Sequence, residues 1–192
     1  MKARLQKRLL IVLALLIIVI LLAYHFSYPI KLNWATLPDD IADYYSQYHH
    51  DQPNPSIALY SGVEIGRKAY YLIGIGEDLG AVTLEKGITG RYKFTHLSYG
   101  SGNFLDGIIE DNGRKYVLFG GRYSTAQISR ITARIGGQSY ELTLPNESEH
   151  FLLYTEINSQ VEDAHVDRNY LAFYNKNGED ITNHYLLSGG GI

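Results

Sequence analysis

The hydrophobic pattern begins with an unbroken apolar run from Leu9 to Tyr24. A stretch that is apolar on every side does not fit one face of a soluble helix. As an α-helix it would be about 24 Å long, slightly shorter than a hydrocarbon core of ~30 Å, and the aromatic residues beyond it extend it into the interface. We therefore predict a transmembrane signal anchor over residues 9–28, with bilayer-facing residues that include Leu9, Leu16, Leu22 and Tyr24.

The residues before this run predict its orientation. Residues 1–8 form a basic head with no acidic residue, and its charges are Lys2, Arg4, Lys7 and Arg8. The positive-inside rule keeps such a head in the cytoplasm and places the C-terminal body outside, at the cell membrane. A cleaved signal peptide is the alternative, but cleavage after Ala23 would put Leu21 at a position that needs a small residue.

Residues 29–55 change to a helical period. One stripe recurs at helical spacing, and its members are Leu37, Ile41, Tyr44, Tyr45 and Tyr48. Thr36 suits the N-cap, and Pro53 and Pro55 stop the helix. The pattern predicts a short juxtamembrane helix followed by a linker.

From Ser56 to residue 187 the pattern is typical of strands. Short runs expected at 57–60, 69–75, 81–84 and 92–99 are separated by glycines. Three hairpins follow, with turns at Asp111-Asn112-Gly113, Gly136-Gly137 and 175–178. The predicted pairs are 107–110 with 115–119, 128–135 with 139–144, and 171–174 with 180–182.

The absence of any helical crossover between these runs indicates a mainly β, antiparallel fold, either a sandwich or a partly closed barrel. Gly121–Thr125 would divide the domain into two small packed lobes, 56–122 and 126–187, and the sequence leaves open whether they share one core. The tail 188–192 is expected to be disordered.

Composition supports this interpretation and excludes some functions. The chain has 17 tyrosines and 19 glycines, which favour strands and turns, and no cysteine, which rules out disulfides and thiolate metal sites. The net charge is −3 overall, so the body after the basic head carries −7. Such a body has no electrostatic reason to bind nucleic acid. No motif calls for a cofactor.

Three stretches carry a family resemblance: LEKGITGRYKF at 84–94, IEDNGRKYVLFGG at 109–121 and LAFYNKNGEDIT at 171–182. Together they resemble uncharacterised single-pass surface proteins of Gram-positive, Bacillus-like bacteria. The resemblance implies a β domain displayed at the cell surface. It assigns no function and carries over no catalytic residue.

Candidate metal chemistry is sparse. His49, His50 and Asp51 are weak candidates for metal ligands, and a site would need a third ligand such as His96 or His150. Adjacent helical residues diverge by about 100°, and histidine at a helix C-terminus also suits the helix dipole.

Candidate catalytic groups are equally isolated. His165 and Asp167 would share one face of an extended segment, which could orient an imidazole as a base. Ser101 lacks the nucleophile elbow that a hydrolase serine needs. Asp106, Glu110 and Asp111 could pair with other carboxylates as glycosidases require. The loops of Asp78, Asp106 and Asp111 could bind calcium, although acidic hairpin tips are usually just solvated.

Two further patterns have structural explanations. Gly74–Gly80 has the wrong spacing for a dinucleotide loop and precedes a strand, so it indicates a β-turn with Glu77 and Asp78 at its tip. Five tyrosines are expected to be buried or half-buried: Tyr70, Tyr92, Tyr116, Tyr140 and Tyr154. An exposed aromatic row that included Trp34 would instead suit a glycan or a partner strand.

The first functional hypothesis is a non-enzymatic binding or protein-interaction module at the cell envelope. Its partner would be an envelope protein or a wall polymer. The alternative is a membrane-tethered cell-wall hydrolase that uses paired carboxylates. A sensor ranks third, because the short basic head is too small for a cytoplasmic domain.

Overall fold

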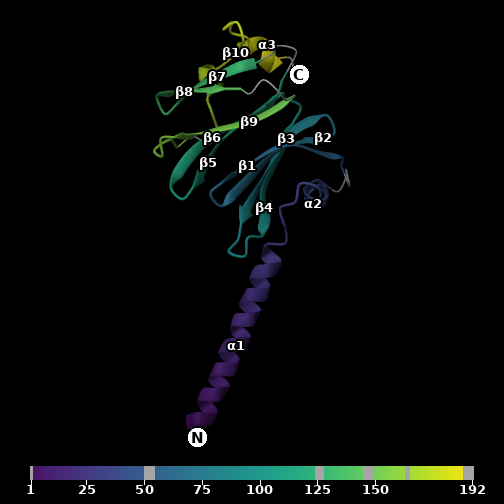
Figure 1. The fold of residues 1–192 in the computed structure, drawn as a ribbon, viewed down its shortest axis with the longest axis vertical. Coiled ribbons are helices and arrows are strands. Elements are labelled where there is room, and N and C mark those ends of the chain that lie inside the picture. Colours follow the sequence, from purple (N-terminus) through teal and green to yellow (C-terminus); the bar gives the residue numbers. More distant parts are fainter. Residues whose placement is uncertain (1, 50–54, 124–127, 145–148, 163–164, 188–192) are drawn as a thin grey trace.

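A computed structural model of the chain describes residues 2–49, 55–123, 128–144, 149–162 and 165–187. It begins with helix α1 (Lys2–Ser27), which projects away from the folded body (Figure 1). Within the described residues, Leu9–Ser27 is the one stretch of helix long and apolar enough to cross a membrane, and none of it is buried. The predicted apolar N-terminal helix is therefore present, although a signal sequence would have the same length and composition.

The body is mainly β and antiparallel, as predicted. Over the described part of the chain its strands form three sheets. The proximal sheet contains β1 (Ile57–Ile65), β2 (Lys68–Ile75), β3 (Asp78–Lys86) and β4 (Tyr92–Gly100) in that order. The middle sheet contains β5 (Phe104–Asp111), β6 (Arg114–Arg122) and β9 (His150–Ile157), and the distal sheet has the order β10 (Leu171–Asn175), β7 (Ile128–Ile135), β8 (Gln138–Thr143).

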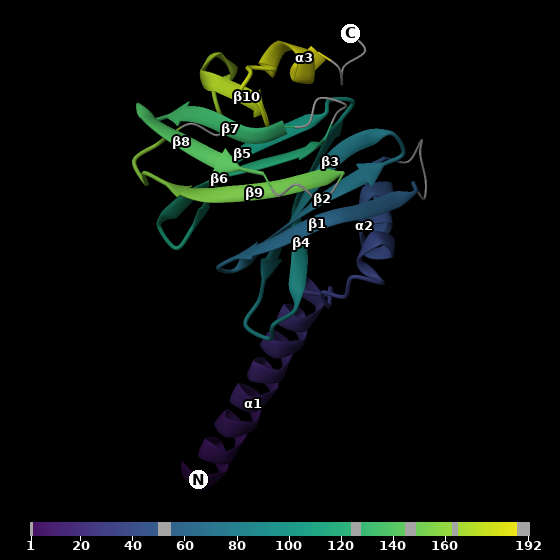
Figure 2. The ribbon, with the colours of Figure 1, turned by 45° about the horizontal axis from the view of Figure 1, so that its top comes forward.

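The sheets are layered because central strands bury both faces. In β2, Ile73 packs in the core that includes helix α2 (Leu37–Ser46), whereas its neighbour Leu72 turns to the middle sheet. In β6, Leu118 shares a core with the proximal sheet, and Phe119 shares one with the distal sheet. Figures 1 and 2 show the resulting stack, with α1 at one end and the distal sheet at the other.

Strand pairing joins the two predicted lobes. β9, which lies in the predicted second lobe, pairs along β6 of the first, from Lys115↔Ile157 to Arg122↔His150. A middle strand needs a neighbour on each edge to satisfy its backbone groups, and β5 and β9 supply them. The strands group as 57–100 and 104–175, and the largest core joins the middle and distal sheets.

Local predictions are largely confirmed. The Gly74–Gly80 segment is a hairpin turn, with Gly76 at φ 60°. The stripe on α2 is buried at Leu37, Ile41 and Tyr45, while Tyr48 is exposed.

The last predicted hairpin is shorter than expected. Its return strand is reduced to one bridge, Tyr174↔Asp180, and helix α3 (Thr182–Leu187) follows at once. Asp180 accepts a hydrogen bond of 2.9 Å from the backbone N–H of Thr182, and this partner and the Thr182 hydroxyl lower the pKa of the Asp180 carboxyl. A side chain of this kind favours a helix start over a strand. The tail 188–192 lies outside the described residues.

Candidate functional site

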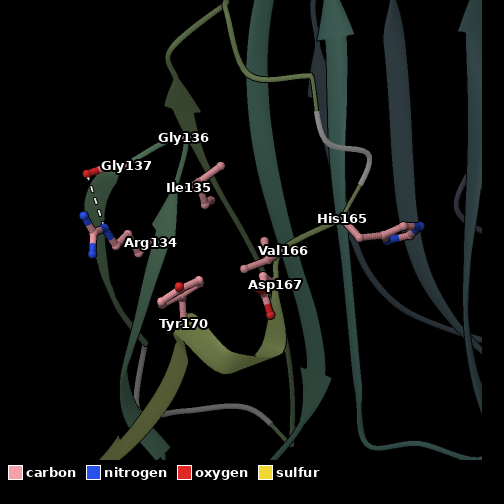
Figure 3. A pocket seen from close by; sticks show the side chains of 8 residues that line it. All are labelled: Arg134, Ile135, Gly136, Gly137, His165, Val166, Asp167 and Tyr170. Carbon is pink, nitrogen blue, oxygen red and sulfur yellow. Dashed lines mark hydrogen bonds between the residues drawn. The ribbon is translucent and has the colours of Figure 1, made fainter.

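An open groove of about 620 Å³ lies where the β7–β8 turn meets residues 165–170 (Figure 3). It is lined by Arg134, Ile135, Gly136, Gly137, His165, Val166, Asp167 and Tyr170. Ile135 and Val166 are almost fully buried and belong to the largest core, so they anchor the apolar part of the groove. The groove therefore combines an apolar base with charged and aromatic side chains.

The turn at one side of the groove depends on its glycines. Gly136 and Gly137 have φ values of 55° and 81°, as a two-residue hairpin turn of the I′ type requires. A Cβ on Gly136 would lie 2.6 Å from Cγ2 of Val161. Both turn residues therefore present backbone, rather than side chains, to the groove.

Arg134 and Tyr170 meet across this groove. The Arg134 guanidinium carbon lies 6.0 Å from the Tyr170 ring centroid, within reach of a cation–π attraction. Its Nε donates a long hydrogen bond of 3.4 Å to the Gly137 carbonyl oxygen, drawn dashed in Figure 3. Among the residues that the structure describes, no carboxylate lies within ion-pair distance of Arg134. Tyr170 is 55% exposed, so both groups are open to a ligand.

Another arginine on the same strand provides a contrast. Arg130 stacks over Tyr174 at 4.3 Å, but it also forms an ion pair of 3.2 Å with Glu141. The charge of Arg130 is therefore partly compensated within the protein. The charge of Arg134 has no such compensation in the described structure.

The predicted His165–Asp167 pair does not form. Asp167 accepts the backbone N–H of Asn169 at 2.9 Å and caps the short helix η1 (Arg168–Tyr170). His165 points away from the groove centre in Figure 3, and its Nδ1 lies 3.7 Å from Oδ2 of Asp106. Its side chain is 75% exposed, and among the described residues no serine or threonine lines the groove.

Asp106 has a structural role at this point. Its side chain is only 8% exposed and accepts the backbone N–H of Val166 at 2.7 Å. It therefore fastens the 165–170 segment to β5. Glu110 follows four residues later on the same strand, about 13 Å away by strand rise, and Asp111 accepts the Arg67 N–H at 3.2 Å. These carboxylates do not converge, so the hydrolase hypothesis gains no acid–base pair from them.

The metal candidates form no ligand cluster among the residues that the structure describes. His50 and Asp51 lie outside the described residues, and His49 stacks on Tyr45 with ring centroids 4.3 Å apart. The described part of the chain contains no group of three potential ligands close enough to hold a metal ion.

A smaller hollow of about 210 Å³ lies beside α2, lined by Tyr44, Tyr45, Tyr48, His49, Thr95, His96 and Leu97. The Tyr45 hydroxyl donates to that of Tyr99 at 3.4 Å, and this bond together with burial raises the pKa of Tyr45 to about 12. The rings of Tyr44 and Tyr48 pack edge-on against each other, and those of Tyr45 and His49 stack, so its aromatic groups are mostly engaged with one another.

The tyrosines divide as expected with one exception. Tyr70 and Tyr92 are buried, and Tyr116 and Tyr140 are half-buried. Tyr154 is 45% exposed, and Trp34 is 55% exposed. Exposed aromatic residues are thus scattered over several elements.

The pairing of Arg134 with Tyr170 was not anticipated from the sequence. Arg130 and Arg134 alternate along β7 with the buried residues Ile131, Ala133 and Ile135. Nothing local indicated that Tyr170, on a later segment, would approach. No protein-family model, curated protein or solved structure matches the chain significantly. The fold and groove define a class by architecture alone: a layered antiparallel β domain that follows an N-terminal apolar helix.

Proposed function

We propose that this protein is a membrane-anchored binding module that holds its β domain outside the cytoplasm and binds an anionic wall polymer in the groove of Arg134 and Tyr170. The anchor would be α1, which is apolar and has no buried residue over Leu9–Ser27. The basic residues before it support a cytoplasmic N-terminus. The distal sheet lies at the opposite end of the body from α1, so the groove would lie at the end remote from the membrane (Figure 2).

The observation that carries this proposal is the uncompensated guanidinium of Arg134 beside the exposed ring of Tyr170. Arginine binds carboxylate and phosphate groups through paired hydrogen bonds. A tyrosine ring offers a flat apolar surface with a polar tip, which suits the face of a sugar. A polymer of sugars that carry acidic groups would supply an anion for Arg134 and a sugar face for Tyr170. An acidic envelope protein is the alternative ligand, and the binding experiment can distinguish it.

Binding should be measured with the full chain in nanodiscs against anionic wall polymer, with a neutral glycan for comparison. We expect R134Q to weaken binding roughly 10-fold or more, since a hydrogen bond between charged groups contributes about 1.5–3 kcal/mol. Y170A should weaken it as well.

R130Q is the matched control, because Arg130 is already paired with Glu141. Equal binding by the R134Q and R130Q variants would contradict the groove as the site. Capture of an acidic protein in place of the polymer, lost in R134Q, would replace the proposed ligand while keeping the groove.

Orientation can be tested separately because the chain contains no cysteine. In intact cells, a membrane-impermeant maleimide should label N177C, in the exposed β10 turn, but not Q6C. Labelling of the Q6C variant alone would reverse the proposed topology.

A further inference from the structure

The tip of the β3–β4 hairpin contacts the end of α1. The backbone N–H of Ile88 donates a hydrogen bond to the Tyr24 hydroxyl. Gly87 packs against Tyr28, where a Cβ would lie only 2.9 Å from Cδ1 of the ring. Tyr24 and Tyr28 stack on each other with centroids 4.8 Å apart. The hairpin and the helix end therefore form one contact surface.

The chain that leaves α1 is also held by this hairpin. The Arg91 guanidinium donates to the Tyr28 carbonyl at 2.9 Å and to that of Pro29. Ile30 and Tyr92 then exchange backbone hydrogen bonds of 3.0 and 2.8 Å. The residues after the helix thus extend the edge of β4, and no free linker separates α1 from the body. This arrangement fixes the body relative to the helix axis.

The contact with Tyr24 also sets the depth of the hairpin tip. Tyr24 lies three residues before the end of α1 at Ser27, so its level is about 5 Å below the helix end at 1.5 Å per residue. Ile88, bonded to Tyr24, shares that level. Its side chain is 80% exposed, more than any other large hydrophobic residue on the described surface. Phe26, in the last turn of α1, is 76% exposed.

We propose that the hairpin tip, residues 87–90, inserts beside α1 into the membrane–water interface on the non-cytoplasmic side of the bilayer, with Ile88 among the lipid chains. This inference rests on the proposed function, since it requires α1 to span the membrane. The partner is the bilayer itself, indicated by the continuity of Ile88 with the apolar helix and by their common depth. The body is then docked on the membrane at a fixed tilt, and the distal groove is held at a fixed height.

The experiment uses single-cysteine variants of the full chain, which has no native cysteine. Each would carry a nitroxide label in nanodiscs, and collision with oxygen would be compared with collision with a water-soluble nickel complex. I88C tests the tip, L22C is the reference inside α1, and N112C at the β5–β6 turn is the exposed control. T89C provides a second label site on the same tip.

We expect the I88C and L22C labels to favour oxygen several-fold, as in lipid, and the N112C label to favour nickel. If L22C is lipid-like while I88C and T89C match N112C, the hairpin does not insert and only this inference is overturned. If L22C also matches N112C, the membrane anchor itself is wrong, and the inference falls with it.

Discussion

The two halves of the body use their aromatic residues differently. In the proximal half, α2 with β1–β4, some rings are buried, such as Tyr45, and others pair near the surface, as Tyr44 does with Phe94 at 4.6 Å. In the distal half, β5–β10 with α3, they seal a core: Phe104 packs edge-on against Phe173 at 4.9 Å, and Tyr185 is fully buried beside them. The proximal half is the one attached to α1. In the distal half, the aromatic core lies beneath the groove and supports the residues that line it.

The halves are nevertheless joined. Ile65, Tyr70 and Leu118 form a small core between the proximal and middle sheets. A Cβ on Gly120 would lie 2.8 Å from Cδ1 of Leu72, so the glycine lets the two sheets approach closely. Arg122 also donates to the Glu77 carbonyl at 2.6 Å. We therefore expect the two halves to unfold together despite their different construction.

The largest effect should come from Phe119, which is fully buried in the distal core. F119A should lower the free energy of unfolding by about 3–5 kcal/mol through lost contacts and a cavity. Urea titration of the detergent-solubilised chain can follow far-UV circular dichroism together with fluorescence of Trp34, the one tryptophan, which lies in the proximal half. Both midpoints should fall together. A Trp34 transition that stays in place would show that the halves unfold independently.

A smaller effect is expected where the groove wall is fastened. D106A removes the carboxylate that accepts the Val166 N–H, so it should cost about 1–3 kcal/mol and weaken ligand binding as the 165–170 segment loosens. E110A is the control on the same strand and should change stability by less than about 0.5 kcal/mol, because Glu110 is exposed. Equal losses in the two variants would contradict the fastening role of Asp106.

These residues also show how far the sequence alone leads. The apolar run and the glycine turns are local signals, and they predicted α1 and most hairpins correctly. Strand β9 was not anticipated, because its place beside β6 depends on partners 28–42 residues earlier in the chain, from Arg122↔His150 to Lys115↔Ile157. The Arg134–Tyr170 and Asp106–Val166 contacts are equally non-local, so no spacing rule could indicate them. The start of α3 at Thr182 did have a local signal, because Asp180 can accept the Thr182 backbone N–H as a helix cap does. The turn pattern at 175–178 instead predicted 180–182 as the return strand of a hairpin.

Acidification should weaken the contact between the halves at His150. Its ring stacks on Tyr60 at 3.5 Å, and burial and the nearby Arg122 charge lower the pKa of the imidazole from its usual 6.5. The unfolded chain then binds the proton more readily. Stability is therefore fully present above about pH 6.5 and falls as the pH drops through and below that value.

Thermal unfolding between pH 7.5 and 5 can measure this loss. H150F keeps an aromatic ring for Tyr60 and should flatten the pH dependence. H96Q, a change at an exposed histidine of β4, should leave it intact. If the H96Q variant flattened the profile and H150F did not, the assignment to His150 would be wrong.

The smallest expected effect separates stability from binding on a single strand. Arg130 and Glu141 form an exposed ion pair of 3.2 Å, so R130Q should lower the free energy of unfolding by at most about 1 kcal/mol. Arg134 has no carboxylate partner in the described structure, so R134Q should change stability by less than about 0.5 kcal/mol. Urea titrations of both variants beside the wild type can resolve the order. The loss of ligand binding should be larger in R134Q than in R130Q, because of these two arginines Arg134 is the one whose charge is available to a ligand. A small stability loss and a large binding loss in R134Q would show that the Arg134 side chain serves binding rather than folding. A stability loss larger than that of R130Q would show that Arg134 has a structural role, and the groove would then lack a cation available to a ligand.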